Sequence, residues 1–120
     1  MIELPDWRQQ QQWDCGPTAV RILLRSLRRR PSPTAMAHLA PSPIDGTDPR
    51  AVEIALRAHD LRVTSGSATF DDLRHWTQNR AVLCLIQCEG VGHWVVVAQA
   101  THRRVSYQCP SDGPQLEKRA

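Results

Sequence analysis

The spacing of the apolar residues changes near residue 81, and this change constrains the fold more than any other feature of the chain. Before it, apolar residues recur three and four positions apart, as on the buried stripe of an amphipathic helix. After it, they form compact runs separated by short turns, which is typical of β-hairpins. Helices followed by hairpin strands predict an α+β fold, with N-terminal helices packed on a C-terminal antiparallel sheet.

The first half of the chain is predicted to form three helical segments. Pro17 fits the first turn of the first helix, and Pro31 ends that helix before a short helical piece at 34–39. The third begins at a cap on Thr47 or Asp48, because both residue types accept hydrogen bonds from a helix N-terminus. The buried faces are expected to carry Ala19, Val20, Leu23, Leu24 and Leu27 in the first helix, and Val52, Ala55, Leu56 and His59 in the third.

A fourth helix is predicted where Thr69 is followed three residues later by Asp72, a spacing that suits reciprocal capping. This helix carries Phe70, Leu73 and Trp76. Between the third and fourth helices, residues 61–64 are expected to form a short strand.

The second half of the chain predicts three strands. The apolar runs at 81–86 and 94–98 flank a glycine-containing turn at 90–92 and therefore form a hairpin. A third strand is expected at 105–109, where Pro110 ends it because proline has no backbone donor.

Length and composition limit the class of protein. The 120 residues suffice for a single domain spanning 1–120, which would bury roughly two-thirds of its unfolded surface. No apolar stretch approaches the roughly 18 residues of a membrane span. Residues 1–13 lack the apolar core of a secretory signal, so we expect a cytoplasmic protein whose four cysteines are reduced.

The net charge of +3 is concentrated in one helix and the residues just after it, at Arg21, Arg25 and 28–30. Basic side chains near a helix C-terminus suit the helix dipole and usually form a solvated face. Because such charges alone carry no base readout, we do not expect a nucleic-acid partner.

Cys15 is the candidate nucleophile. The segment Asp14-Cys15-Gly16-Pro17 places this thiol where a loop becomes a helix, and a helix N-terminus with a nearby histidine favours the thiolate form of a cysteine. The Cys15 amide and the side-chain amide of Gln9 would then form a two-donor oxyanion hole. The alternative, a buried inert cysteine, suits Cys84 and Cys88 better because both lie in or next to an apolar run.

His93 is the candidate base. It is the one histidine that lies between a glycine-containing turn and an apolar strand, a setting that holds an imidazole rigidly. A zinc site is the competing interpretation, since Cys88, His93, His102 and Cys109 are all possible ligands. No pair of cysteines has the two-residue spacing of zinc motifs, so we expect neither a metal nor another cofactor.

Two motifs resemble those of the bacteriocin-processing, double-glycine-leader cysteine peptidases, a papain-like family found at the front of certain peptide exporters. The first motif, Q-x4-D-C-G, corresponds to Gln9, Asp14 and 15–16, and the second, G-H-aromatic-V-V, corresponds to residues 92–96. Asp45-Gly46-Thr47 looks like the family's middle region, so the resemblance covers roughly residues 9 to 113. It implies that Cys15 is the nucleophile, His93 the general base and then acid, and Gln9 the oxyanion donor.

The sequence departs from this family at the third catalytic position. The family has an Asp-Pro pair whose carboxylate orients the histidine, and this chain has Cys109-Pro110. Three accounts stay open: Asp112 supplies the carboxylate, Cys109 or Gln108 substitutes for it, or the enzyme works with a Cys-His pair alone. Losing the carboxylate reduces catalysis without abolishing it.

The sequence therefore favours a thiol peptidase that acts on a peptide through a Cys15 thioester. An acyltransferase or amide-forming tailoring enzyme would use the same thioester with an amine as acceptor. A peptide-binding module without turnover is the third hypothesis, motivated by Cys109. A transporter or biosynthetic partner is compatible with each of the three.

Overall fold

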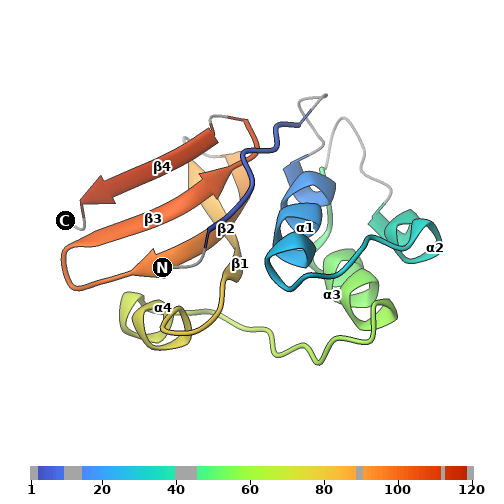
Figure 1. Ribbon diagram of the computed structural model, residues 1–120, viewed down its shortest axis with the longest axis horizontal. Coiled ribbons are helices and arrows are strands. Elements are labelled where there is room, and N and C mark those ends of the chain that lie inside the picture. The colour runs from blue at the N-terminus through green and yellow to red at the C-terminus, as the bar shows by residue number, and fades with distance from the viewer. Residues whose placement is uncertain (1–2, 10–14, 40–45, 89–90, 112, 119–120) are drawn as a thin grey trace.

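The computed structural model describes residues 3–9, 15–39, 46–88, 91–111 and 113–118. Figure 1 shows α1, α2 and α3 on one side of an antiparallel sheet, with α4 at its lower end. The predicted α+β arrangement is confirmed. In chain order the elements are α1 (Cys15–Ser26), α2 (Pro33–Met36), the 3-10 helix η1 (Ala37–Leu39), α3 (Pro49–Ala58), α4 (Phe70–Trp76), β1 (Val82–Cys88), β2 (Val91–Ala100), β3 (Arg104–Cys109) and β4 (Gly113–Lys118).

The helix starts follow from capping chemistry. Asp48 caps α3 by accepting a hydrogen bond from the backbone N–H of Arg50 at 2.8 Å, which decides between the two predicted caps. At α4, Thr69 and Asp72 form the predicted reciprocal capping box. The predicted inner face of α3 is buried through Val52, Ala55, Leu56 and the capping His59.

Leu27 is a correction to the predicted buried stripe of α1. The helix ends at Ser26, and Leu27 lies in the turn that follows, where 41% of it is exposed. Ile22, which was not assigned to the stripe, is fully buried instead. Leu27 stays outside the core because the helix ends before it, whereas Ile22 follows Ala19 at the spacing of the buried stripe.

The predicted strand at 61–64 is wrong. Residues 61–65 have no regular structure, although Leu61 and Val63 pack as partly buried side chains against the core. A strand requires a partner, and residues 61–64 pair with none of the described strands. The predicted turn at 90–92 is also too long, because Val91 and Gly92 already pair within the hairpin of β1 and β2.

The sheet is a simple meander in the order β1-β2-β3-β4, with every neighbouring pair antiparallel. The sequence did not predict β4. Its segment Gly113–Lys118 contains one large apolar residue, Leu116, which is 63% exposed. An edge strand held by backbone hydrogen bonds needs no alternation of apolar residues, so this one leaves little signal in the sequence.

Strand β2 is internal and has a different environment on each face. Trp94 and Val96 are buried in one apolar cluster with Cys15 and the inner side of α1. Val95 and Val97 are buried with Cys109 in a second, smaller cluster. Because side chains alternate along a strand, the core lies between α1 and one face of the sheet.

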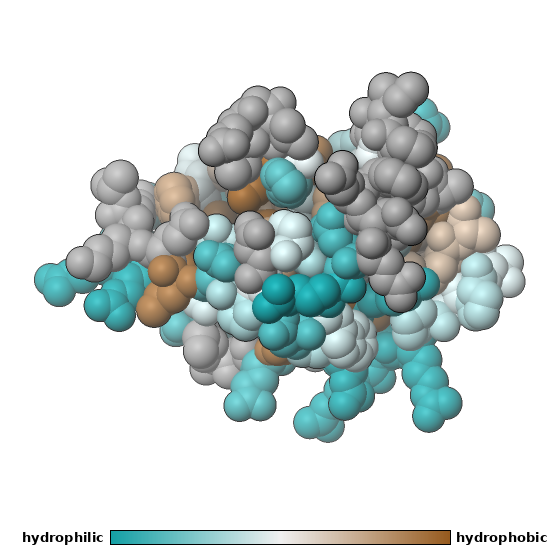
Figure 2. Space-filling view, turned by 90° about the horizontal axis from the view of Figure 1, so that it is seen from above, coloured by the Kyte–Doolittle hydropathy of each residue, from teal (hydrophilic) through white to brown (hydrophobic). Residues whose placement is uncertain are grey.

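The surface agrees with the expected solvated arginine face. Arg21 and Arg25 are exposed on α1, and Arg29 donates to the backbone oxygen of His59 at 2.8 Å. On the face seen in Figure 2, hydrophobic side chains show in small separate patches among hydrophilic ones. Within the described residues, no helix combines the length and apolar character that a membrane crossing requires.

Candidate active site

Cys15 is the first residue of α1, as its position before Pro17 predicted. Its side chain is 7% exposed and belongs to the core cluster that α1 shares with β2. The helix therefore presents the backbone N–H groups of its first turn close to this thiol. These donors have no partners within the helix, so they can face a developing negative charge.

Gly16 fits closely against Thr47. A Cβ atom on Gly16 would lie only 2.4 Å from Thr47 Oγ1 and 2.5 Å from Thr47 Cβ, so no larger residue fits without movement. On its other side, the backbone oxygen of Thr47 accepts a hydrogen bond from Trp94 Nε1 at 3.1 Å. Thr47 thus joins the residue that follows Cys15 to the residue that follows His93.

His93 is the third residue of β2 and pairs with Ile86 of β1. Its side chain is half-buried. The register between Val82–Cys88 and β2 runs without a bulge past His93, so alternation places His93 on the same face as Val95 and opposite to Trp94. Through Thr47, the structure therefore connects Gly16, which follows Cys15, to Trp94, which follows His93. The described side chains of Cys15 and His93 form no hydrogen bond with each other.

Gln9 is held against the end of β3. Its backbone N–H donates to the oxygen of Pro110 at 2.9 Å, across almost the whole length of the sequence. Asp6 and Arg8, which precede Gln9, support this attachment. Asp6 accepts hydrogen bonds from Arg8 Nε at 2.8 Å and from Gln108 Nε2 at 3.0 Å.

Two hydrogen bonds hold the pKa of Asp6 below its ordinary value of 3.8. The bond from Arg8 has the larger effect and the bond from Gln108 the smaller. Arg8 also lies directly over Gly113, where a Cβ atom would collide with its guanidinium. Gly113 has φ of +84°, a conformation that favours glycine for a second reason. Residues 6–9 are thus fixed on the β3–β4 corner through both side chains and backbone.

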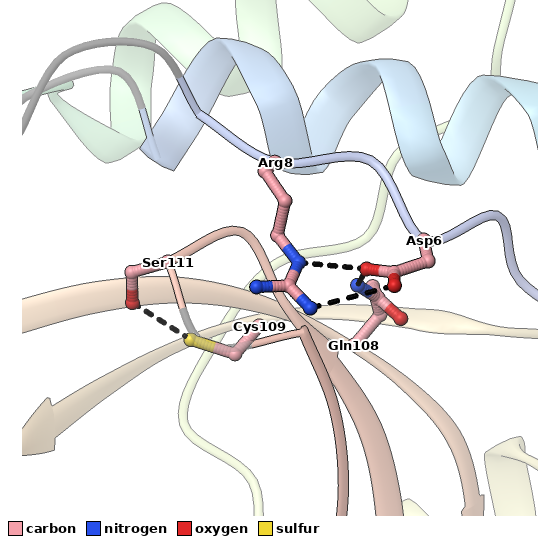
Figure 3. Close-up of polar contacts among 5 residues, drawn as sticks. All are labelled: Asp6, Arg8, Gln108, Cys109 and Ser111. Atoms are coloured by element: carbon pink, nitrogen blue, oxygen red, sulfur yellow. Dashed lines mark hydrogen bonds and ion pairs between the residues drawn. The ribbon is translucent and has the colours of Figure 1, made fainter.

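Cys109 occupies the position at which the family resemblance implies an orienting carboxylate. Figure 3 shows Cys109 Sγ turned toward Ser111 Oγ, 3.1 Å away, while Gln108 turns toward Asp6. Cys109 is buried beside Val95, so it occupies the face of the sheet to which His93 belongs. Gln108 pairs with Val96 and lies on the opposite face. Asp112, the remaining candidate, lies outside the described residues.

Cys84 differs chemically from a nucleophile. Burial raises the pKa of the Cys84 thiol from 9.0 to about 11, because the apolar surroundings disfavour the thiolate. This agrees with its predicted inert role. The side chain of Cys88 lies outside the described part of the structure. Among the residues that the structure describes, no group of three or more His, Cys, Asp or Glu side chains is arranged to hold a metal ion.

Comparison with known proteins gives the family. Residues 4–120 match the family described as the peptidase C39 family. The chain belongs to that family. This confirms the resemblance to the bacteriocin-processing cysteine peptidases, and the family and fold are those of papain-like cysteine peptidases in general.

One solved structure is similar over nearly the entire chain. It is the crystal structure of a double glycine motif protease from an AMS/PCAT transporter in complex with the leader peptide. The TM-score is 0.79 at 16% sequence identity, and the alignment covers 98% of this chain and 81% of that one. At this identity the match shows a shared fold. No curated protein matches the chain.

Sequence reasoning placed Thr47 at a helix cap and did not find its contacts with Gly16 and Trp94. Gly16 carried part of the signal, because a glycine directly after Cys15 indicates that another group approaches the backbone closely there. The structure shows a protein side chain in contact with that glycine. The attachment of Asp6 to Gln108 had no signal in the sequence, since the two residues are 102 positions apart.

We predict that Gly16→Ala destabilises the fold, because the new methyl group overlaps Thr47. Overpacking of this kind costs about 1 to 3 kcal/mol. Gly66→Ala is the matched control, because a Cβ atom on Gly66 meets nothing within 4 Å. Thermal unfolding followed by circular dichroism should show a lower midpoint for Gly16→Ala alone, and equal midpoints would contradict the close contact.

We also predict that stability falls as the pH rises from about 9 to about 11. In this window the unfolded chain loses the Cys84 proton while the folded chain, with its raised pKa, retains it. The contribution of Cys84 is complete below pH 9, and its loss should amount to about 1 to 2 kcal/mol, reduced by partial exposure. Urea unfolding of the wild type and Cys84→Val at several pH values measures it, and parallel curves for the two proteins would contradict the raised pKa.

Proposed function

We propose that this chain is a thiol peptidase in which Cys15 and His93 act as a catalytic pair. The observation that supports this best is the contact of Thr47 with both Gly16 and Trp94, because it fixes the two motifs beside each other. Membership of the C39 family supports the same reaction class. In resting enzymes a catalytic hydrogen bond often forms only with substrate bound, so its absence between Cys15 and His93 does not count against the pair.

In the proposed reaction, His93 takes the thiol proton and Cys15 Sγ forms a bond to the carbonyl carbon of the peptide. The tetrahedral intermediate then breaks its C–N bond as His93 gives that proton to the leaving amine. Water, deprotonated by His93, attacks the thioester. The C–S bond breaks, the carboxylic acid leaves, and the proton returns to the thiol.

The oxyanion would be held by two donors, the backbone N–H of Cys15 and the side-chain amide of Gln9. The first is supported by the position of Cys15 at the start of α1. The second is supported by the bond from the Gln9 backbone to Pro110, which restrains this residue beside the β3 corner. Donors that are already oriented stabilise developing charge without reorganisation, which is the main catalytic contribution of such sites.

We further propose that the pair works without a carboxylate from residues 108–111. Gln108 faces away from His93 and donates to Asp6, and Cys109 is a thiol beside Ser111. Asp112, close to these residues in sequence, is the alternative carboxylate, and we propose the pair without it. The imidazole would then depend on packing for its orientation, so turnover should be slow compared with a complete triad.

The proposed substrate is a peptide, and a leader that ends in two glycines is the specific candidate. The support is the similar structure, which is that of a double glycine motif protease in complex with the leader peptide. A peptide-binding module that has lost turnover is the second candidate function, and Cys109 at the third catalytic position favours it. An added amine would distinguish acyl transfer from hydrolysis by the product formed.

Alkylation by iodoacetamide tests the pair directly. We predict that Cys15 reacts at neutral pH much faster than Cys84, and that His93→Ala slows Cys15 by roughly tenfold or more because the general base is lost. His102→Ala is the matched control, since His102 is an exposed histidine in the turn after β2. Mass spectrometry of the labelled peptides gives both rates. A Cys15 rate that ignores His93 would rule out the proposed pair.

Restoring the family's carboxylate should increase turnover. We predict that Cys109→Asp raises the rate of hydrolysis of a Gly-Gly leader peptide roughly tenfold, because an aspartate there stabilises the imidazolium. Cys109→Asn controls for size, and the thermal midpoint monitors the cost of the buried charge. If Cys109→Asp changes nothing and Asp112→Asn lowers the rate, Asp112 is the orienting carboxylate and the two-residue proposal is wrong.

A further inference from the structure

We infer that Thr47 is a positioning residue for the Cys15–His93 pair, and this inference rests on the proposed function. Thr47 precedes α3 and lies outside both catalytic motifs. It nevertheless contacts the residue after the proposed nucleophile and the residue after the proposed base. It can therefore fix the separation of α1 from β2 at the point where their chemistry meets.

Thr47 contacts α1 by van der Waals packing of its side chain against Gly16. Three atoms of the Thr47 side chain, Oγ1, Cβ and Cγ2, surround the position that a Cβ atom on Gly16 would occupy, at 2.4, 2.5 and 3.0 Å. The first turn of α1 therefore rests directly on a β-branched side chain, which has few accessible rotamers. A rigid side chain against a glycine backbone leaves the turn that carries Cys15 little freedom to move.

The contact with β2 is a hydrogen bond. Trp94 Nε1 donates to the backbone oxygen of Thr47 at 3.1 Å, and Trp94 is 7% exposed. Since an indole has one donor, its orientation is determined by this bond and by the packing around it. The backbone of β2 next to His93 is fixed by the same residue that fixes α1.

Thr47 is itself held by its neighbours along the chain. Gly46 has a φ of +65°, and Asp48 caps α3 through the N–H of Arg50. Thr47 lies between this left-handed residue and the start of a helix, so its backbone has little freedom. The loop before α3 can thus transmit the position of one motif to the other.

Thr47 could act through a hydrogen bond of its hydroxyl group or through the shape of its side chain. Thr47 Oγ1 is buried, and no hydrogen-bond partner for it exists among the described residues. A buried hydroxyl without a partner is unfavourable, so hydrogen bonding by this group does not explain the threonine. The shape of the side chain does, and valine has the same shape. We therefore expect that Thr47→Val preserves the position of Cys15 and that Thr47→Ala does not.

The experiment measures alkylation of Cys15 by iodoacetamide between pH 5 and 9 in the full chain. Thr47→Ala should lower the His93-dependent rate roughly 10-fold to 100-fold, because small misplacements of reacting groups have effects of this size. Thr47→Val should react like the wild type, and Thr47→Ser, which lacks the methyl group, should resemble Thr47→Ala. The pH profile should change shape only in those variants whose alkylation rate falls.

Thr64→Ala is the matched control, because Thr64 is exposed in the loop before α4. If Thr47→Ala does not fold, Trp94→Phe removes the indole donor, keeps an aromatic ring, and should alter the same pH profile. Equal profiles for the wild type and all three Thr47 variants would overturn the inference. A loss in Thr47→Val that Thr47→Ser rescues would also overturn it, since the hydroxyl would then be the active group.

If Cys15 and His93 do not form a catalytic pair at all, the alkylation experiment gives a different result. In that case the wild-type rate at Cys15 would already be independent of His93, before any change at Thr47. Thermal midpoints of all variants, recorded under the same conditions, separate a general loss of structure from displacement of the thiol. A variant that lowers the midpoint and leaves the pH profile unchanged would show that Thr47 has a structural role alone.

Discussion

The contact between Gly16 and Thr47 is the constraint on which the rest of the site depends. It requires a residue without a side chain immediately after Cys15, and a side chain of defined shape before α3. The same loop connects the helix layer to the sheet, because the backbone oxygen of Thr47 also accepts a hydrogen bond from Trp94. The interior between them is close-packed, so a change at one contact moves both.

The N-terminal segment is attached to the corner between β3 and β4. The Asp6–Arg8 ion pair is exposed, and such pairs contribute little stability on their own. Here the same carboxylate also binds the buried Gln108, and the segment continues to the backbone bond between Gln9 and Pro110. Several weak attachments along one short segment together restrict it far more than any one of them. The corner between β3 and β4 thus serves as an anchor for residues from the opposite end of the chain.

Local sequence signals predicted the parts of this fold that depend on local chemistry. Capping residues predicted the starts of α3 and α4, and compact apolar runs predicted β1, β2 and β3. The false strand at 61–64 and the missed β4 both depend on which edges are available for pairing, which the segments themselves do not encode. For the site, motif residues were located correctly in their elements. The contacts that hold them, through Thr47 and Asp6, join distant positions and have no periodicity to detect.

The bond between Gln9 and Pro110 has a consequence for the order in which the molecule is made. Its two partners are synthesised at opposite ends of the chain, so the proposed oxyanion donor can be fixed only after Pro110 has left the ribosome. At elongation rates of roughly 5 to 20 residues per second, several seconds pass between the synthesis of Cys15 and that of Pro110. A nascent chain would therefore carry Cys15 before the proposed oxyanion donor is held in place.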